Sequence, residues 1–105
     1  MELKFGGKLE IGDPIIVSYG HGIDFGLFAG YGRGTIQYYL PGGIIYHAES
    51  AARKGTKPKF YKAYIRGDNM KYRVVKVTPD ILFNEEDVMQ YERAIEILKL
   101  ENIVK

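Results

Sequence analysis

The fold is decided by residues 12–47, which read GDPIIVSYGHGIDFGLFAGYGRGTIQYYLPGGIIYH. Short apolar runs, rich in β-branched and aromatic residues, alternate in this stretch with turns made of glycine and proline. Such runs predict short strands. Gly26 and Gly30 interrupt the second run, which favours a bent or bulged strand over a helix. The strands expected here are residues 15–19, 25–31, 35–40 and 44–47.

The segments on either side extend this pattern. Upstream, apolar residues alternate around Gly6-Gly7 and predict a short strand or hairpin. Downstream, residues 48–54 predict one or two helical turns that stop at Gly55. Residues 60–65 and 71–77 then predict a hairpin across Gly67-Asp68-Asn69.

The C-terminal segment has the pattern of an amphipathic helix. Asn84 is a candidate N-cap, and acids follow it in the first turn, where the helix dipole favours negative charge. Apolar residues then recur at spacings of three and four, so one face should pack on the sheet. These apolar residues are Val88, Tyr91, Ile95 and Leu98.

Together these patterns predict one mostly β domain of the α+β kind, spanning residues 1–105. Residues 1–79 are β-rich, and residues 84–101 form the helix that packs on the sheet. The expected architecture is a small twisted antiparallel sheet, or an SH3-like barrel, of about five to seven strands closed by the C-terminal helix.

Positive charge is concentrated in residues 53–76, RKGTKPKFYKAYIRGDNMKYRVVK. This stretch holds nine bases and one acid, a net charge of +8, whereas the whole chain carries +2. Clustered bases with interleaved aromatics are typical of surfaces that meet phosphates. The leading hypothesis is therefore a non-enzymatic, accessory module that binds RNA or DNA through this hairpin. The residues expected to contact phosphates are Lys57, Lys59, Lys62, Arg66, Lys71 and Arg73, with Tyr61 or Tyr64 stacking on bases.

Two structural explanations of the same bases compete with the nucleic-acid hypothesis. Lysines on an edge strand also protect a sheet against aggregation, and the acidic C-terminal helix could fold back and pair with the bases. A third possibility is a protein-interaction module, such as an inhibitor of a larger enzyme, anchored by exposed tyrosines.

The glycine-rich segment 20–34 supports a second binding hypothesis. Its spacing fits neither a dinucleotide fingerprint nor a P-loop, and barrel corners and bulges account for most of its glycines. A backbone nest with a basic side chain could still hold a small anion such as a nucleotide, in a protein that sequesters it, often as an oligomer. The residues of that alternative site are Gly30, Gly32, Arg33, Gly34 and Thr35.

One local resemblance points to nucleic acid as well. Gly12-Asp13-x-Ile15-x-Val17, followed by Gly20 and Gly26-x-Phe28, resembles the KOW element of SH3-like nucleic-acid-binding barrels. The last glycine interval differs by one residue, and His21 and Asp24 stand where the typical loop has lysines. The resemblance covers less than a fifth of the chain and implies an SH3-like barrel.

No residue pattern predicts catalysis, a metal or a cofactor. The chain has no cysteine, which excludes disulfides and thiolate chemistry and fits a reducing, cytoplasmic location. Nothing in the sequence brings His21 and His47 together for acid–base chemistry. Each histidine has one nearby acid, Asp24 or Glu49, which is too few ligands for zinc. No apolar run is long enough to span a bilayer.

Overall fold

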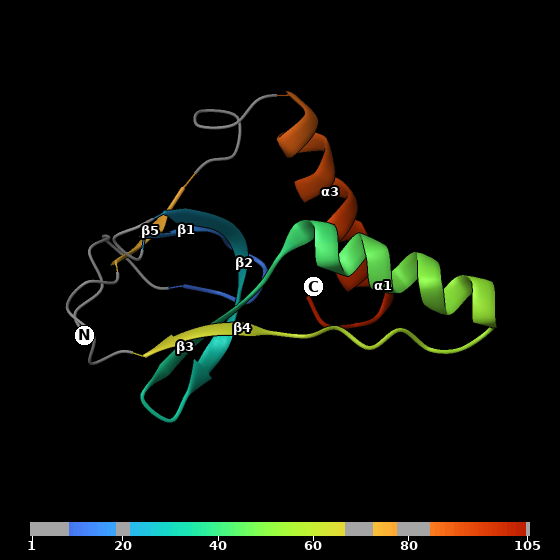
Figure 1. Cartoon of the computed structure of the whole chain (residues 1–105), viewed down its shortest axis with the longest axis horizontal. Coiled ribbons are helices and arrows are strands. Elements are labelled where there is room, and N and C mark those ends of the chain that lie inside the picture. Colours follow the sequence, from blue (N-terminus) through green and yellow to red (C-terminus); the bar gives the residue numbers. More distant parts are fainter. Residues whose placement is uncertain (1–8, 19–21, 67–72, 78–84, 105) are drawn as a thin grey trace.

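The computed structural model describes residues 9–18, 22–66, 73–77 and 85–104. It contains a five-stranded antiparallel sheet in the order β4-β3-β2-β1-β5 and two helices (Figure 1). The predicted α+β class, twisted antiparallel sheet and C-terminal helix are confirmed. The strands are β1 (Pro14–Ser18), β2 (Ile23–Gly32), β3 (Thr35–Tyr39), β4 (Ala63–Arg66) and β5 (Arg73–Lys76), and the helices are α1 (Pro41–Lys54) and α3 (Glu85–Leu100).

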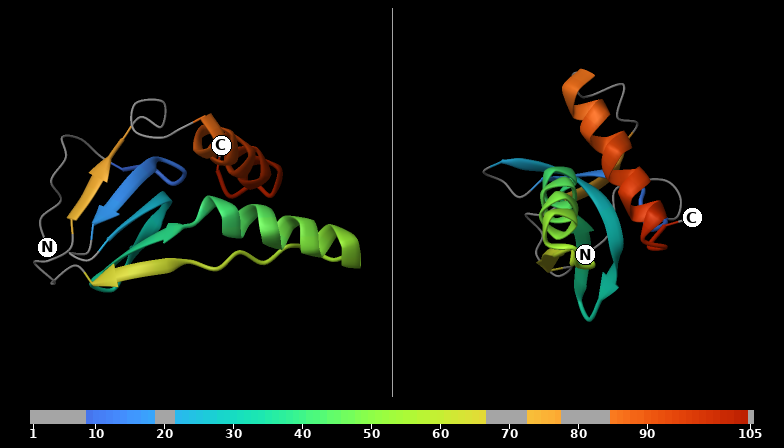
Figure 2. Two further views of the ribbon diagram at one scale, coloured as in Figure 1. Left: turned by 45° about the horizontal axis from the view of Figure 1, so that its top comes forward. Right: turned by 90° about the vertical axis from the view of Figure 1, so that its right-hand side faces the viewer.

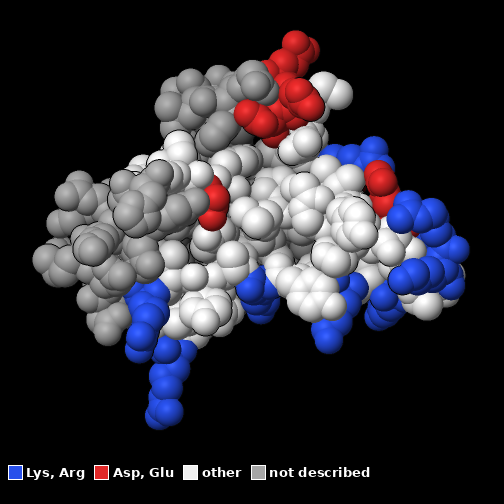
Figure 3. Space-filling view, viewed as in Figure 1, with Lys and Arg blue, Asp and Glu red and all other residues white. Residues whose placement is uncertain are grey.

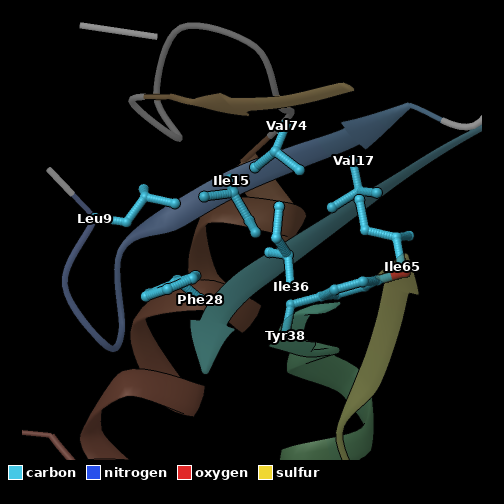
Figure 4. Packing of buried hydrophobic residues seen from close by; sticks show 8 residues of the cluster. All are labelled: Leu9, Ile15, Val17, Phe28, Ile36, Tyr38, Ile65 and Val74. Atoms are coloured by element: carbon cyan, nitrogen blue, oxygen red, sulfur yellow. The ribbon is translucent and has the colours of Figure 1, made fainter. Parts of the chain in front are cut away.

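The sheet curls around a cluster of buried apolar residues on its inner face (Figure 4). Ile65 of β4 and Val74 of β5 belong to this one cluster although their strands lie at opposite edges of the sheet. The described strands do not close into a barrel, so the twisted sheet is the correct one of the two predicted architectures. The inner cluster consists of Leu9, Ile15, Val17, Phe28, Ile36, Tyr38, Ile65 and Val74.

The two helices pack on the outer face, at one end of the sheet (Figure 2). Leu27 of β2 and Tyr39 of β3 are neighbours of inner-face residues in sequence, so they point to the opposite side. There they meet Ile44 of α1 and Leu98 of α3. Both helices therefore pack against β2 and β3.

Strand β2 contains a bulge between Phe28 and Gly30, as the glycine pattern predicted. Gly30 has a φ of +126°, a conformation that favours glycine. The extra residue of the bulge shifts the side-chain alternation by one position, so Phe28 and Tyr31 lie on the same face of the sheet. The centroids of their rings are 4.9 Å apart.

The strand predicted at residues 44–47 is wrong, because these residues lie within α1. Pro41 stands in the first turn, where its fixed φ suits a helix and its missing N–H costs nothing. Ile44 and Ala51 are buried on one side of α1, two turns apart. Packing of this side against the sheet overrides the β-propensity of Ile44-Ile45-Tyr46. The helix predicted over 48–54 and its stop at Gly55 are confirmed.

The predicted hairpin of residues 60–77 is also wrong. Strand β4 pairs with β3, and β5 pairs with β1, so the two strands occupy opposite edges of the sheet. The error lay in assuming that consecutive strands pair with each other. Each strand instead lies at one edge of the sheet, whose centre consists of β1, β2 and β3. Burial of Ile65 and Val74 in the inner cluster stabilises this arrangement.

Candidate functional site

The basic residues from the end of α1 to β4 are exposed along one margin of the molecule, which we call the basic edge. Figure 3 shows Lys and Arg side chains along this margin, below β4 and the segment before it and at the end of α1. No acidic residue occurs between Ser50 and Arg66. The basic edge comprises Arg53, Lys54, Lys57, Lys59, Lys62 and Arg66, all exposed.

The end of α1 determines where this surface lies. Gly55 takes the left-handed conformation, with φ 68° and ψ 28°, and its N–H and that of Thr56 bond back to the last helical carbonyls. The chain then reverses, and residues 57–62 return beside α1 toward β4 (Figure 1). Phe60 packs against the outer-face cluster of Leu27, Tyr39, Ile44 and Leu98 and anchors this returning segment. Its neighbours Lys59 and Tyr61 remain exposed.

Aromatic rings lie among the bases. Tyr61 and Tyr64 are 63% and 66% exposed. The Nζ of Lys59 lies 5.8 Å from the centroid of the Tyr61 ring, and the Nζ of Lys62 lies 6.0 Å from that of Tyr39. Two of the predicted bases, Lys59 and Lys62, thus lie beside aromatic rings, and Lys57 and Arg66 are exposed in the same stretch.

Of the other two predicted phosphate contacts, the structure places only Arg73, and it lies away from this group. Arg73 belongs to β5, at the opposite edge of the sheet from β4. Lys71 lies outside the described residues, as does His21. The candidate surface is therefore smaller than the basic stretch of the sequence, because the sheet separates its two halves.

Arg33, by contrast, lies near one end of the basic edge. It is exposed in the two-residue turn between β2 and β3, next to Gly34 with its φ of +66°. Thr35 begins β3 and lies opposite Arg66. Arg33 therefore lies at the end of the sheet where the basic edge finishes.

The glycines of the alternative anion site have structural roles. Gly30 lies in the bulge and Gly34 in the turn, both at positive φ. Gly32 is covered by polar side chains: a Cβ there would meet Thr35 Oγ1 and lie 2.6 Å from Gln37 Nε2. The space above Gly32 is thus occupied by groups of the protein itself.

The acids in the first turn of α3 stand apart from the basic edge. In Figure 3 one group of acidic side chains lies over the start of α3, away from the basic margin, whereas another acidic side chain lies beside the bases at the end of α1. The ion pair between the helices has the opposite polarity, since α3 supplies its base: Arg93 Nη2 lies 3.1 Å from Glu49 Oε1. A second pair joins Lys76 to Asp13 at 3.3 Å. Neither pair uses a base of residues 53–62.

Two of the described tyrosines have raised pKa values. Burial raises the pKa of Tyr39. Burial, followed by the charges of Asp13 and Glu92, raises the pKa of Tyr91. Both tyrosines stay neutral at physiological pH. Within the described part of the chain, no three His, Asp or Glu side chains are grouped to hold a metal ion, and no helix is long and apolar enough to cross a membrane.

The sequence did not predict that Tyr46 and His47 would lie near Tyr61, beside the basic edge. The ring centroids of His47 and Tyr61 are 5.0 Å apart, and those of His47 and Tyr46 are 5.1 Å apart. Reading residues 44–47 as a strand hid this grouping. The available signal was Pro41, which allows a helix to begin there and to run on to the helical turns predicted over 48–54.

In comparisons with family models, with curated proteins and with solved structures, nothing matches this chain.

Proposed function

We propose that the protein is a non-enzymatic module that binds nucleic acid, RNA or DNA, along the basic edge. The observation that carries the proposal is the run of six exposed bases from Arg53 to Arg66, without an acid between them and with Tyr61 and Tyr64 interleaved. Bases of this kind neutralise phosphates and release their counterions, and exposed rings are suited to stacking on nucleobases.

The length of the basic edge favours a polymer over a small anion. Residues 57–66 are largely extended, and ten extended residues span roughly 30 Å. A single nucleotide would reach only a few of these charges. An acidic protein segment would satisfy the charges but would leave the exposed tyrosine rings without a flat partner. We assign a cytoplasmic location to the same proposal, since a chain without cysteine needs no oxidising compartment.

The test is a binding titration with a fluorescein-labelled 20-nucleotide strand, followed by anisotropy at several salt concentrations. The logarithm of the association constant should fall linearly with the logarithm of salt, by about 0.7 per phosphate contact for a single strand. Binding that does not depend on salt would overturn the proposal.

Two matched variants locate the surface. Lys62→Glu and Lys99→Glu change the net charge equally, and both lysines are exposed, but Lys62 lies on the basic edge whereas Lys99 lies in the last turn of α3. We expect Lys62→Glu to weaken binding about tenfold or more and Lys99→Glu to have a much smaller effect. Equal losses would show that net charge, and not the basic edge, governs binding.

A further inference from the structure

Three aromatic side chains lie in a row beside the basic edge: Tyr46, His47 and Tyr61, which we call the ring cluster. Adjacent rings meet edge to face, with interplanar angles of 84° for Tyr46 and His47 and 61° for His47 and Tyr61. Both tyrosines are 63% exposed, and His47 is half-buried between them. Core packing therefore does not account for the two tyrosine rings.

The ring cluster is assembled from two segments. Tyr46 and His47 belong to α1, whereas Tyr61 belongs to the segment that returns beside α1 after the turn at Gly55. Edge-to-face contact with His47 supports the Tyr61 ring and limits its rotation, so less freedom is lost when a ligand covers it. The Lys59 ammonium lies over the Tyr61 ring, 5.8 Å from its centroid, so a positive charge stands directly beside the ring cluster.

We propose that the ring cluster is a stacking site for an unpaired nucleobase, and that the basic edge therefore binds single strands in preference to duplexes. This inference rests on the proposed function. In a duplex the base faces are covered by neighbouring base pairs, so only an unpaired base offers its face to Tyr61 or Tyr46. The Lys59 ammonium lies over the Tyr61 ring and would neutralise a phosphate next to the stacked base.

The experiment compares three probes with the wild-type protein at one salt concentration: a single-stranded oligothymidylate, an abasic sugar-phosphate strand of the same length, and a duplex of that length. The oligothymidylate should bind about tenfold more tightly than the abasic strand for each base that stacks. It should also bind more tightly than the duplex. Equal affinity for the oligothymidylate and the abasic strand would overturn the stacking site.

Variants then locate the stacking. The double substitution Tyr46→Leu with Tyr61→Leu should lower the affinity for oligothymidylate about tenfold or more, toward that for the abasic strand, and leave the abasic affinity unchanged. Tyr31→Leu is the matched control, because Tyr31 is 58% exposed but contacts Phe28 of the inner cluster. Circular dichroism establishes that each variant is folded, and the comparison of probes with the wild type needs no variant.

The outcomes separate the two proposals. If the abasic strand binds as tightly as oligothymidylate while Lys62→Glu still weakens both, the ring cluster has no stacking role and the basic edge keeps its function. If no probe binds, or binding does not respond to salt, the proposed function itself fails. If the double tyrosine variant keeps the full preference for bases, the stacking site lies elsewhere and the inference is wrong.

Discussion

The hydroxyl group of Tyr38 donates a hydrogen bond of 2.9 Å to Oδ2 of Asp24, across the inner face of the sheet. Tyr38, in β3, lies opposite Phe28 of β2 and is only 4% exposed. Its side chain extends along β2 toward Asp24. Between them is Gly26, whose missing side chain makes room for the tyrosine ring. This hydrogen bond links β2 and β3, the two strands against which both helices pack.

Removal of this hydroxyl should cost stability without changing the fold. Tyr38→Phe keeps the ring in the inner cluster and removes one hydrogen bond, which we expect to lower the free energy of unfolding by about 1 kcal/mol. Urea denaturation should show a lower midpoint with an unchanged m-value. An unaltered midpoint would mean that the hydrogen bond contributes no net stability.

The contact between Gly26 and Tyr38 predicts a stronger effect. A Cβ at residue 26 would lie 2.6 Å from Cδ2 of Tyr38 and 3.0 Å from the carbonyl oxygen of Tyr39. Gly26→Ala should therefore destabilise the protein by about 1–3 kcal/mol. The control is Gly42→Ala in α1, where a Cβ meets nothing within 4 Å and alanine favours the helix. Thermal unfolding should show a lower midpoint for the first variant and an equal or higher midpoint for the second.

The turn at Gly55 predicts a purely conformational cost. A Cβ there meets no atom within 4 Å, but the φ of +68° disfavours residues with side chains. Gly55→Ala should destabilise the protein by about 1 kcal/mol, and Gly55→Asn by less, because asparagine tolerates the left-handed region. If both variants were as stable as the wild type by urea denaturation, the helix would not need its left-handed end.

Alkaline pH should destabilise the protein through its buried tyrosines. The pKa of Tyr39 is raised in the folded state from 10.0, because burial disfavours the phenolate. Below pH 10 both states keep the proton. Above it the unfolded chain releases the proton more readily, so stability falls as pH rises through the folded pKa. Tyr39→Phe should flatten this decline in urea denaturation between pH 9 and about 11, and an identical decline in both proteins would contradict the assignment.

A substitution of Arg33 distinguishes strand binding at the basic edge from nucleotide binding at the alternative anion site. If Arg33 extends the basic edge, Arg33→Ala should lower the salt dependence of single-strand binding by about one phosphate contact. A nucleoside triphosphate should then bind weakly to the wild type and the variant alike. Loss of tight triphosphate binding with unchanged binding of the long strand would instead support a nucleotide site at residues 30–35.

Much of the fold could be predicted from local pattern. The alternation of apolar and turn residues located β1, β2 and β3, and the bulge at Gly30 followed from glycine within a strand. Acids at residues 85–87 and the apolar spacing after them located α3. In each of these elements local propensity agrees with the packing that the fold requires.

The remaining features depend on contacts between distant residues. The helical state of Ile44 and Tyr46 follows from burial of Ile44 against the sheet, which strand propensity does not reveal. The pairing of β5 with β1 depends on burial of Val74 beside Ile15. Because that pairing was missed, Arg73 was grouped with Lys62, although their strands lie at opposite edges of the sheet. The ring cluster could not be predicted because residues 44–47 have strand propensity, whereas it is the helix α1 that places His47 beside Tyr61.

The pairing of β1 with β5 also governs the order in which the chain can fold. Strands β1, β2 and β3 are neighbours in sequence, so they can pair while the ribosome is still making the rest of the chain. Ile15, however, pairs with Lys76, and Val74 completes the inner cluster. One edge of β1 must therefore wait until most of the chain has been synthesised, and contacts so distant in sequence slow folding. We expect the amide protons that form hydrogen bonds between β1 and β5 to be the last to gain protection from exchange in a pulse-labelled refolding experiment.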